Sequence, residues 1–206
     1  MTLPRSRAAV VVVAACAFAL SACAGEGPLP SAPDLESHVD VDTPALREAK
    51  ADIGVQPCPS PEGPGSDLPE LTLTCLGGGR DVRLSDVSGP AVVQLWASWC
   101  TSCPDELPLY QRLRDEYGDR LTVLGVDWQD TQPGKAMALL ELTGTTMPQL
   151  ADPGGDLADH YRLTGLPGIL LVDEEGAVTF KLMRIDDYDQ LLGLVRDHTG
   201  VPVEAG

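Results

Sequence analysis

Two cysteines three residues apart, Cys100 and Cys103, are the residues of this chain best suited to chemistry. Thiols at this spacing can close into a disulfide and reopen, and the thiolate is the form that attacks another disulfide. A helix that starts at this pair would offer Cys100 unpaired backbone N–H groups and a partial positive charge, which favour its thiolate. We therefore predict a cycling dithiol/disulfide pair in which Cys100 attacks and Cys103 resolves.

The flanking residues supply the elements that would position this pair. Residues 91–97 form an apolar, β-favouring run long enough for one buried strand. Beyond Cys103, apolar residues recur at helical spacing at Leu107, Tyr110, Leu113 and Tyr117. A buried strand that leads directly into a helix places the two cysteines in the turn between them.

The rest of the chain alternates predicted strands and helices. We expect an N-terminal hairpin from residues 71–76 and 83–84, further strands at 121–127, 169–172 and 178–182, and a short edge segment at 147–150. We expect helices from Thr43-Pro44 to Gly54, at 134–142, at 156–163, and from an Asp186 cap to Gly200. Strands alternating with helices predict an α/β sandwich.

Three segments of this chain resemble the TlpA/ResA-like extracytoplasmic branch of the thioredoxin superfamily. They are Trp96-Ala97-Ser98-Trp99-Cys100-x-x-Cys103, its continuation Cys103-x-x-Glu106-x-Pro108, and Gly165-Leu166-Pro167. The resemblance covers about residues 67–200. It implies a thioredoxin-like three-layer sandwich with a central mixed sheet and an N-terminal β-hairpin extension. It also implies thiol–disulfide oxidoreductase activity.

The resemblance also implies roles for residues around the cysteine pair. Pro167 is expected to be cis and to lie against Cys100, with the Leu166 backbone free to pair with a substrate strand. A plain trans turn proline is the alternative. Trp99 is expected to be a partly exposed platform beside Cys100, whereas Trp96 suits the core.

Two positions depart from the family pattern. Ser102 stands where the family usually has proline before the second cysteine, and Gly168 stands where threonine usually follows the cis-proline. Because the residues between the cysteines help to set the stability of the disulfide, the family's usual potential does not carry over to this chain.

Glu106 is the candidate acid/base group. It follows Cys103 by three residues, on the same side of the predicted helix, where it could take or return the proton of the resolving thiol. A first-turn glutamate that only complements the helix dipole is the alternative. Gln94 occupies the strand position where thioredoxins carry a buried aspartate, and an amide cannot exchange a proton at neutral pH.

The N-terminus has the pattern of a bacterial lipoprotein signal. Arg5 and Arg7 precede 13 apolar residues, too few to span a bilayer comfortably, and Leu20-Ser21-Ala22-Cys23 resembles a lipobox. An ordinary signal peptide with a chance Cys23 is the alternative. We expect residues 1–22 to be signal, 23–57 to be a lipidated cysteine and mostly disordered tether, and 58–206 to be the thioredoxin-like domain.

Four cysteines remain once Cys16 leaves with the signal and Cys23 takes the lipid. The motif pairs Cys100 with Cys103, which leaves Cys58 and Cys75 as a candidate structural disulfide. It would close a loop of 18 residues, worth about 3 kcal/mol in the chain-entropy picture. A second redox pair and a zinc site built from all four cysteines are the alternatives.

Composition limits the classes of partner. Without Arg5 and Arg7 the mature chain would carry 12 basic and 31 acidic residues, a formal charge of −19, which disfavours nucleic acid. We expect a monomer without metal or cofactor, on the outer face of the cell membrane, that exchanges electrons with extracytoplasmic protein disulfides or dithiols and is recycled by a membrane redox partner. A thiol peroxidase of the same fold and a non-catalytic binding domain are the alternatives.

Overall fold

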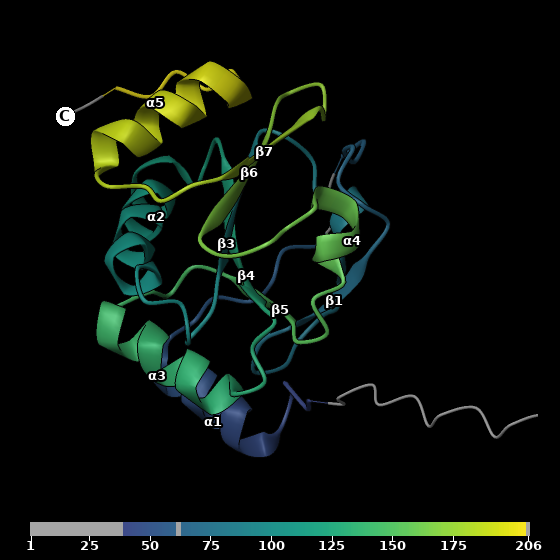
Figure 1. Cartoon of the computed structure of the whole chain (residues 1–206), viewed down its shortest axis with the longest axis vertical. Coiled ribbons are helices and arrows are strands. Elements are labelled where there is room, and N and C mark those ends of the chain that lie inside the picture. Colours follow the sequence, from purple (N-terminus) through teal and green to yellow (C-terminus); the bar gives the residue numbers. More distant parts are fainter. Residues whose placement is uncertain (1–38, 61–62, 205–206) are drawn as a thin grey trace, which may run out of the picture. The chain divides into compact units, whose positions relative to one another are not determined.

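A mixed sheet of seven strands forms the centre of the fold (Figure 1), in the order β2-β1-β5-β4-β3-β6-β7. The computed structural model describes residues 39–60 and 63–204. The strands are β1 (Thr72–Cys75), β2 (Val82–Arg83), β3 (Ala91–Trp96), β4 (Thr122–Trp128), β5 (Gln149–Asp152), β6 (Gly168–Val172) and β7 (Val178–Leu182). The helices are α1 (Pro44–Ile53), a 3₁₀ turn η1 (Leu84–Asp86), α2 (Cys103–Tyr117), α3 (Pro133–Thr143), α4 (Leu157–Tyr161) and α5 (Tyr188–Thr199).

Strand β3 is the middle of this sheet and leads into the cysteine pair. All six of its residues are buried, as the apolar run predicts. It runs parallel to β4 and antiparallel to β6, with Trp96 opposite Asp127 and Leu95 opposite Gly168. The carboxyl ends of β3 and β4 therefore meet at one edge of the sheet, beside the start of α2.

One predicted strand has a different place in the sheet. The sequence predicts an edge segment at residues 147–150, but β5 lies inside the sheet, parallel to β4 on one side and antiparallel to β1 on the other. The N-terminal hairpin causes the difference. Because β1 pairs with β5 through Thr74 and Ala151, the hairpin extends the sheet and covers the edge that β5 would otherwise form.

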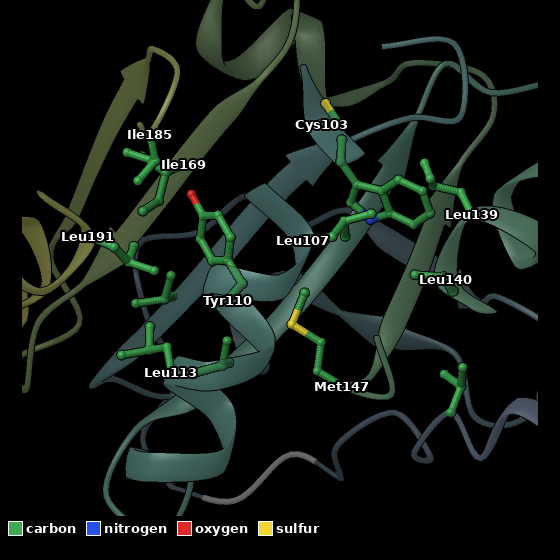
Figure 2. Packing of buried hydrophobic residues seen from close by; sticks show 14 of the residues in the cluster. Cys103, Leu107, Tyr110, Leu113, Leu139, Leu140, Met147, Ile169, Ile185 and Leu191 are labelled. Atoms are coloured by element: carbon green, nitrogen blue, oxygen red, sulfur yellow. The ribbon is translucent and has the colours of Figure 1, made fainter. Parts of the chain in front are cut away.

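Two hydrophobic clusters pack on opposite faces of the sheet. The larger one joins side chains of α1, α2, α3 and α5, and the other joins β1, β2 and α4. Figure 1 shows these four helices along one side of the sheet and α4 on the other. Figure 2 shows the larger cluster, in which Cys103, Leu107 and Tyr110 of α2 point inward among aliphatic side chains. The resulting architecture is the predicted three-layer sandwich of the thioredoxin type.

The N-terminal part of the described chain packs on this sandwich. Thr43 caps α1 by accepting a hydrogen bond from the backbone N–H of Leu46, and Gly54 ends it in a left-handed conformation with φ of 80°, as the sequence predicts. Val41, Leu46 and Val55 are buried in the larger cluster, and burying each stabilises the fold by roughly 1.5–3 kcal/mol. Residues 41–55, which the sequence pattern assigns to the tether, therefore pack against the larger cluster.

The cap of α5 and the lengths of the helices are the remaining features of the helical elements. Helix α5 is capped by Asp187, one residue later than predicted, since the carboxylate of Asp187 accepts the N–H of Gln190. Within residues 39–60 and 63–204, every helix is too short or too polar to cross a membrane.

Candidate active site

Cys100 and Cys103 lie in the turn between β3 and α2, joined as a disulfide with a Cα–Cα distance of 5.5 Å. Cys103 is the first residue of α2 and is fully buried, whereas Cys100 precedes the helix and is 5% exposed. Cys100 is therefore the more accessible of the two, although in the disulfide form the difference is small. The following Pro104 lies in the first helical turn, where its missing N–H leaves no hydrogen bond unmade.

A surface groove of about 610 Å³ opens over Cys100. Trp99 and Leu166, two of the predicted substrate-contacting residues, line it together with Cys100. The Trp99 side chain is 48% exposed, and Trp96 is fully buried, as predicted for a platform and a core residue. Asp105 and Arg184 also line the groove, and their side chains form an ion pair of 3.1 Å.

The loop after β4 holds the cysteine turn in place. The carboxylate of Asp130 accepts the backbone N–H of Ser98 at 2.7 Å, and the Trp99 indole donates to the carbonyl of Gln129 at 3.0 Å. The ring of Trp128 packs against Trp99 with a centroid distance of 6.3 Å. Trp99 is thus exposed but fixed at its polar end, so it offers a rigid surface beside Cys100.

Besides Asp130, a second buried carboxyl, that of Asp127, lies near the carboxyl end of β4. Asp127 is the penultimate residue of β4 and lies opposite Trp96. Its pKa is well above the usual value, first because it is desolvated and second because the Asp130 charge is close. Neither Asp127 nor Asp130 is among the site residues predicted from the sequence. A signal was present, because acids that directly follow a buried parallel strand lie at the carboxyl edge of the sheet, where sites form in α/β folds.

Glu106 lies one turn beyond Cys103 and is also fully buried. Neither of its carboxylate oxygens has a hydrogen-bond partner of standard geometry among the described residues, although the Ile185 backbone is close enough to affect its pKa. Burial raises the pKa of Glu106 to about 7, while the Ile185 backbone and the Arg184 charge act in the opposite direction. A carboxyl with this pKa exchanges protons at neutral pH, which a dipole-complementing surface glutamate would not do.

Two further polar side chains are buried in this part of the core. Gln94 on β3 and the Tyr110 hydroxyl on α2 are both inaccessible and have no partner among the described residues. Tyr110 is one helical turn from Glu106, and its pKa is raised well above the usual value by burial and then by the Glu106 charge. Neither an amide nor such a phenol supplies a proton at neutral pH, so Glu106 is the titrating group next to Cys103 along α2.

The peptide bond between Leu166 and Pro167 is cis, as the resemblance implies. Pro167 directly precedes β6, which pairs with β3. At Gly168 a Cβ would meet Leu95 Cδ1 at 3.3 Å, a close contact that a shift of a few tenths of an ångström would relieve, and Phe180 Cε2 at 3.5 Å, an ordinary contact.

The remaining two cysteines of the domain, Cys58 and Cys75, form a second disulfide with a Cα–Cα distance of 5.9 Å. Cys75 belongs to β1, which is separated from β3 by β5 and β4. The bridge is therefore remote from the Cys100 groove. The predicted lipidation residue, Cys23, lies outside the described residues.

The chain is similar to known thiol–disulfide exchange proteins in sequence and in fold. The model of the AhpC/TSA family matches residues 64–181, more than half of the chain. The thiol:disulfide interchange protein DsbE of Allochromatium vinosum is 36% identical over 126 residues, which are 60% of this chain and 64% of that protein. The thiol-disulfide oxidoreductase ResA of Bacillus cereus is 25% identical over 137 residues, 66% of this chain and 78% of that one.

Solved structures agree in fold. MTB DsbF, solved in mixed oxidised and reduced forms, superposes with a TM-score of 0.56 at 27% identity and covers 62% of this chain and 94% of its own. The chain thus spans a little under two thirds of the DsbE relative and nearly all of the DsbF structure.

Proposed function

The chain belongs to the AhpC/TSA family, and from this premise we propose that it is a thiol–disulfide oxidoreductase that reduces disulfides of extracytoplasmic proteins. One observation carries the proposal: Cys100 lies in an open groove, and the buried Cys103 is already at disulfide distance behind it. The names of the relatives, thiol:disulfide interchange protein and thiol-disulfide oxidoreductase, support the same chemistry.

The reaction consists of two thiol–disulfide exchanges. The Cys100 thiolate attacks one sulfur of a substrate disulfide, and the other substrate sulfur leaves as a thiolate and takes up a proton. Cys103 then loses its proton and attacks Cys100, which releases the second substrate thiol and closes the Cys100–Cys103 bridge. Two electrons pass to the substrate, and a membrane redox partner must return them to the enzyme. Glu106 is the proposed acceptor of the Cys103 proton.

Substrate binding is assigned to the groove over Cys100. Trp99 would contact the apolar part of the substrate, and the Leu166 backbone beside Pro167 would pair with an extended substrate segment. The formal net charge of −17 disfavours nucleic acid as a partner. We propose a monomer, because the exchange needs no residue from a second copy.

Two alternative functions are separated by one pair of assays. A thiol peroxidase needs a Pro-x-x-x-Thr-x-x-Cys context, but Val93 and Ala97 stand where that pattern before Cys100 has proline and threonine. We expect the protein to catalyse insulin reduction by dithiothreitol and to leave hydrogen peroxide unconsumed above the Cys100→Ala background. Peroxide consumption without insulin reduction would support the peroxidase, and inactivity in both assays would support a binding domain.

We further propose that lipid on Cys23 holds the protein at the outer face of the cell membrane. Cys23→Ala should move the protein from the membrane fraction to the soluble extracytoplasmic fraction, because the domain itself offers no spanning helix among the described residues. Cys16→Ala is the matched control, since that residue would leave with the signal. Retention of exported Cys23→Ala protein in the membrane would contradict lipid anchoring.

The Cys58–Cys75 disulfide is proposed to be structural in the oxidised protein. It joins the proline-rich segment after α1 to β1, and Cys58 and Cys75 are both buried in the smaller cluster. In this role it restricts the unfolded chain and keeps the segment 57–59 on the sheet.

A further inference from the structure

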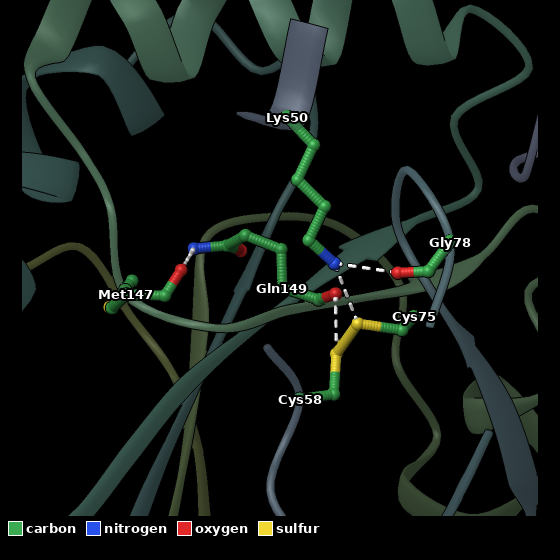
Figure 3. Close-up of a disulfide and its surroundings, with 6 residues drawn as sticks. All are labelled: Lys50, Cys58, Cys75, Gly78, Met147 and Gln149. Atoms are coloured by element: carbon green, nitrogen blue, oxygen red, sulfur yellow. Dashed lines mark hydrogen bonds between the residues drawn. A yellow bond between two sulfur atoms is a disulfide. The ribbon is translucent and has the colours of Figure 1, made fainter. Parts of the chain in front are cut away.

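The ammonium group of a buried lysine lies on the Cys58–Cys75 disulfide (Figure 3). Lys50 Nζ donates a hydrogen bond to Cys75 Sγ at 3.0 Å and another to the carbonyl oxygen of Gly78 at 2.7 Å. Lys50 belongs to α1, is 9% exposed, and reaches across 25 residues of sequence to this sulfur. A sulfur in a disulfide is a weak acceptor, so this charged donor is poorly matched to the oxidised form.

Lys50 also lacks a negative partner while the bridge is closed. No carboxylate of the described residues lies within ion-pair distance of its Nζ. Asp42, which acts on Lys50 through its charge, is held by the Arg47 guanidinium, whose Nε and Nη2 donate to its two carboxylate oxygens at 2.6 and 2.9 Å. Desolvation accordingly lowers the pKa of Lys50. A thiolate at Cys75 would supply the missing charge at hydrogen-bond distance.

The other sulfur has a partner that also suits only the reduced form. Cys58 Sγ lies 3.2 Å from the carbonyl oxygen of Gln149, but a disulfide sulfur carries no hydrogen to donate (Figure 3). After reduction the Cys58 thiol can donate to this oxygen. The surroundings therefore hold one acceptor for a thiol and one cation for a thiolate, each next to a different cysteine.

We propose that Cys58–Cys75 is a second redox site, which a dithiol reductant opens by attacking Cys58 while Lys50 stabilises the departing Cys75 thiolate. The reductant's thiolate bonds to Cys58 Sγ as the bond between Cys58 and Cys75 breaks. The reductant's second thiol then loses its proton and attacks the reductant sulfur that is bonded to Cys58. The reductant leaves with its two sulfurs joined in a disulfide, and the released Cys58 thiolate takes up a proton. Two electrons move from the reductant to the bridge.

Accessibility favours the same direction of attack. Cys58 is 7% exposed, whereas Cys75 is fully buried in β1. The neighbours of Cys58 on both sides, Pro57 and Pro59, line a surface cavity of about 210 Å³. The cavity reaches the two neighbours of Cys58 and not Cys58 itself, so the greater exposure of Cys58 is what favours attack on its sulfur. Opening the bridge would release the segment 57–59 from β1, so the structural disulfide would act as a reversible connection between them.

The chain allows both disulfides to be followed separately in one experiment. Tryptic cleavage places Cys58 and Cys75 in the peptide 51–80 and Cys100 and Cys103 in the peptide 84–112, because no lysine or arginine interrupts either. The full chain is equilibrated at pH 7.5 with ratios of reduced to oxidised dithiothreitol, quenched in acid and alkylated. The mass of each peptide then gives the reduced fraction of each bridge.

We expect Lys50→Met to decrease the equilibrium constant for reduction of Cys58–Cys75 at least tenfold, a shift of about 30 mV, because it removes the charge and keeps the aliphatic length. In this variant the first peptide begins at residue 48, since the cleavage site at Lys50 is lost. Lys135→Met, at an exposed position of α3, is the matched control and should leave this constant unchanged. The Cys100–Cys103 peptide should be unchanged in both variants. An unchanged or increased constant for Cys58–Cys75 in Lys50→Met would overturn the proposal and leave Lys50 as a cap of the Gly78 carbonyl.

A measurement on the unaltered protein is independent of how the variant folds. The full chain is treated briefly with glutathione, quenched in acid, alkylated and cleaved, and fragmentation of the peptide 51–80 locates the adduct. We expect glutathione on Cys58 and the alkyl group on Cys75. Glutathione predominantly on Cys75, or a bridge that forms no adduct at any glutathione concentration short of unfolding, would contradict the proposal.

Discussion

Cells that produce the Cys103→Ala variant should accumulate covalent complexes between this protein and its substrates. In the wild-type protein the mixed disulfide on Cys100 is short-lived, because Cys103 lies at disulfide distance and displaces the substrate. Removing Cys103 leaves the attack by Cys100 intact and abolishes the displacement. The complexes should appear as bands on a non-reducing gel that vanish with reductant, and mass spectrometry of the bands would identify the substrates.

The matched control is Cys100→Ala, which should trap nothing and reduce insulin at the uncatalysed rate. Cys103 is fully buried at the start of α2, so it cannot reach a disulfide in the groove where Cys100 is exposed. Both variants lose the same disulfide, so a difference between them reports the order of attack and not the loss of the bridge. Complexes trapped only by Cys100→Ala would reverse the assignment of the two thiols.

The local elements around the cysteine pair could be predicted because their signals are local. The apolar run before Cys100 gives β3 within one residue of its predicted end, and Thr43 and Gly54 give both ends of α1. The caps of α1 are hydrogen bonds between neighbours in sequence, and the apolar run of β3 marks a buried strand even though the strands that pair with it are distant in sequence. The exposure of Trp99 and the burial of Trp96 follow in the same way, from opposite ends of one turn.

The features that the sequence did not predict correctly, or did not predict at all, depend on contacts between segments that are distant in sequence. Whether β5 is an edge depends on where the hairpin β1-β2 docks, and no pattern within residues 147–150 records that. Asp130 binds the backbone of Ser98 across 32 residues, and Lys50 reaches Cys75 across 25. Such pairs are set by the packing of the whole sheet. The Glu106 environment is of this kind, because its burial depends on the chain after β7 that contains Arg184 and Ile185.

Glu106→Gln should make the protein more stable above pH 7 while slowing the second exchange step. A carboxyl whose pKa rises from 4.5 in the unfolded chain to about 7 in the folded one binds its proton more tightly when folded. Its contribution to stability is therefore complete below pH 4.5, decreases as the pH rises to 7, and is absent above. The shift corresponds to at most about 3 kcal/mol in the free energy of unfolding, and to less where solvent screens the carboxyl.

Urea unfolding at pH 4.5, 6 and 8 measures this contribution. The glutamine side chain cannot ionise, so the variant should lack the decrease in stability that the wild-type protein shows between the first and last of these pH values. Glu141→Gln, at an exposed position of α3, is the control and should follow the wild-type profile within about 0.5 kcal/mol. Parallel profiles for Glu106→Gln and the wild-type protein would mean that Glu106 is hydrated and ionised throughout.

The kinetic arm separates a proton-transfer role from a purely structural one. In stopped-flow measurements with a disulfide peptide, release of the second peptide thiol should rise through an apparent pKa near 7 in the wild-type protein, because the carboxylate form accepts the Cys103 proton. Glu106→Gln should lose this transition and slow the step about 100-fold at pH 7, at the lower end of the usual effect of a general base. Formation of the mixed disulfide by Cys100 should change far less, since Glu106 follows Cys103 by one helical turn and does not line the groove. An equal loss in both steps would instead point to a distorted site. If Glu106→Gln is more stable than the wild-type protein above pH 7 but releases the second peptide thiol at the wild-type rate, Glu106 has no role in the exchange.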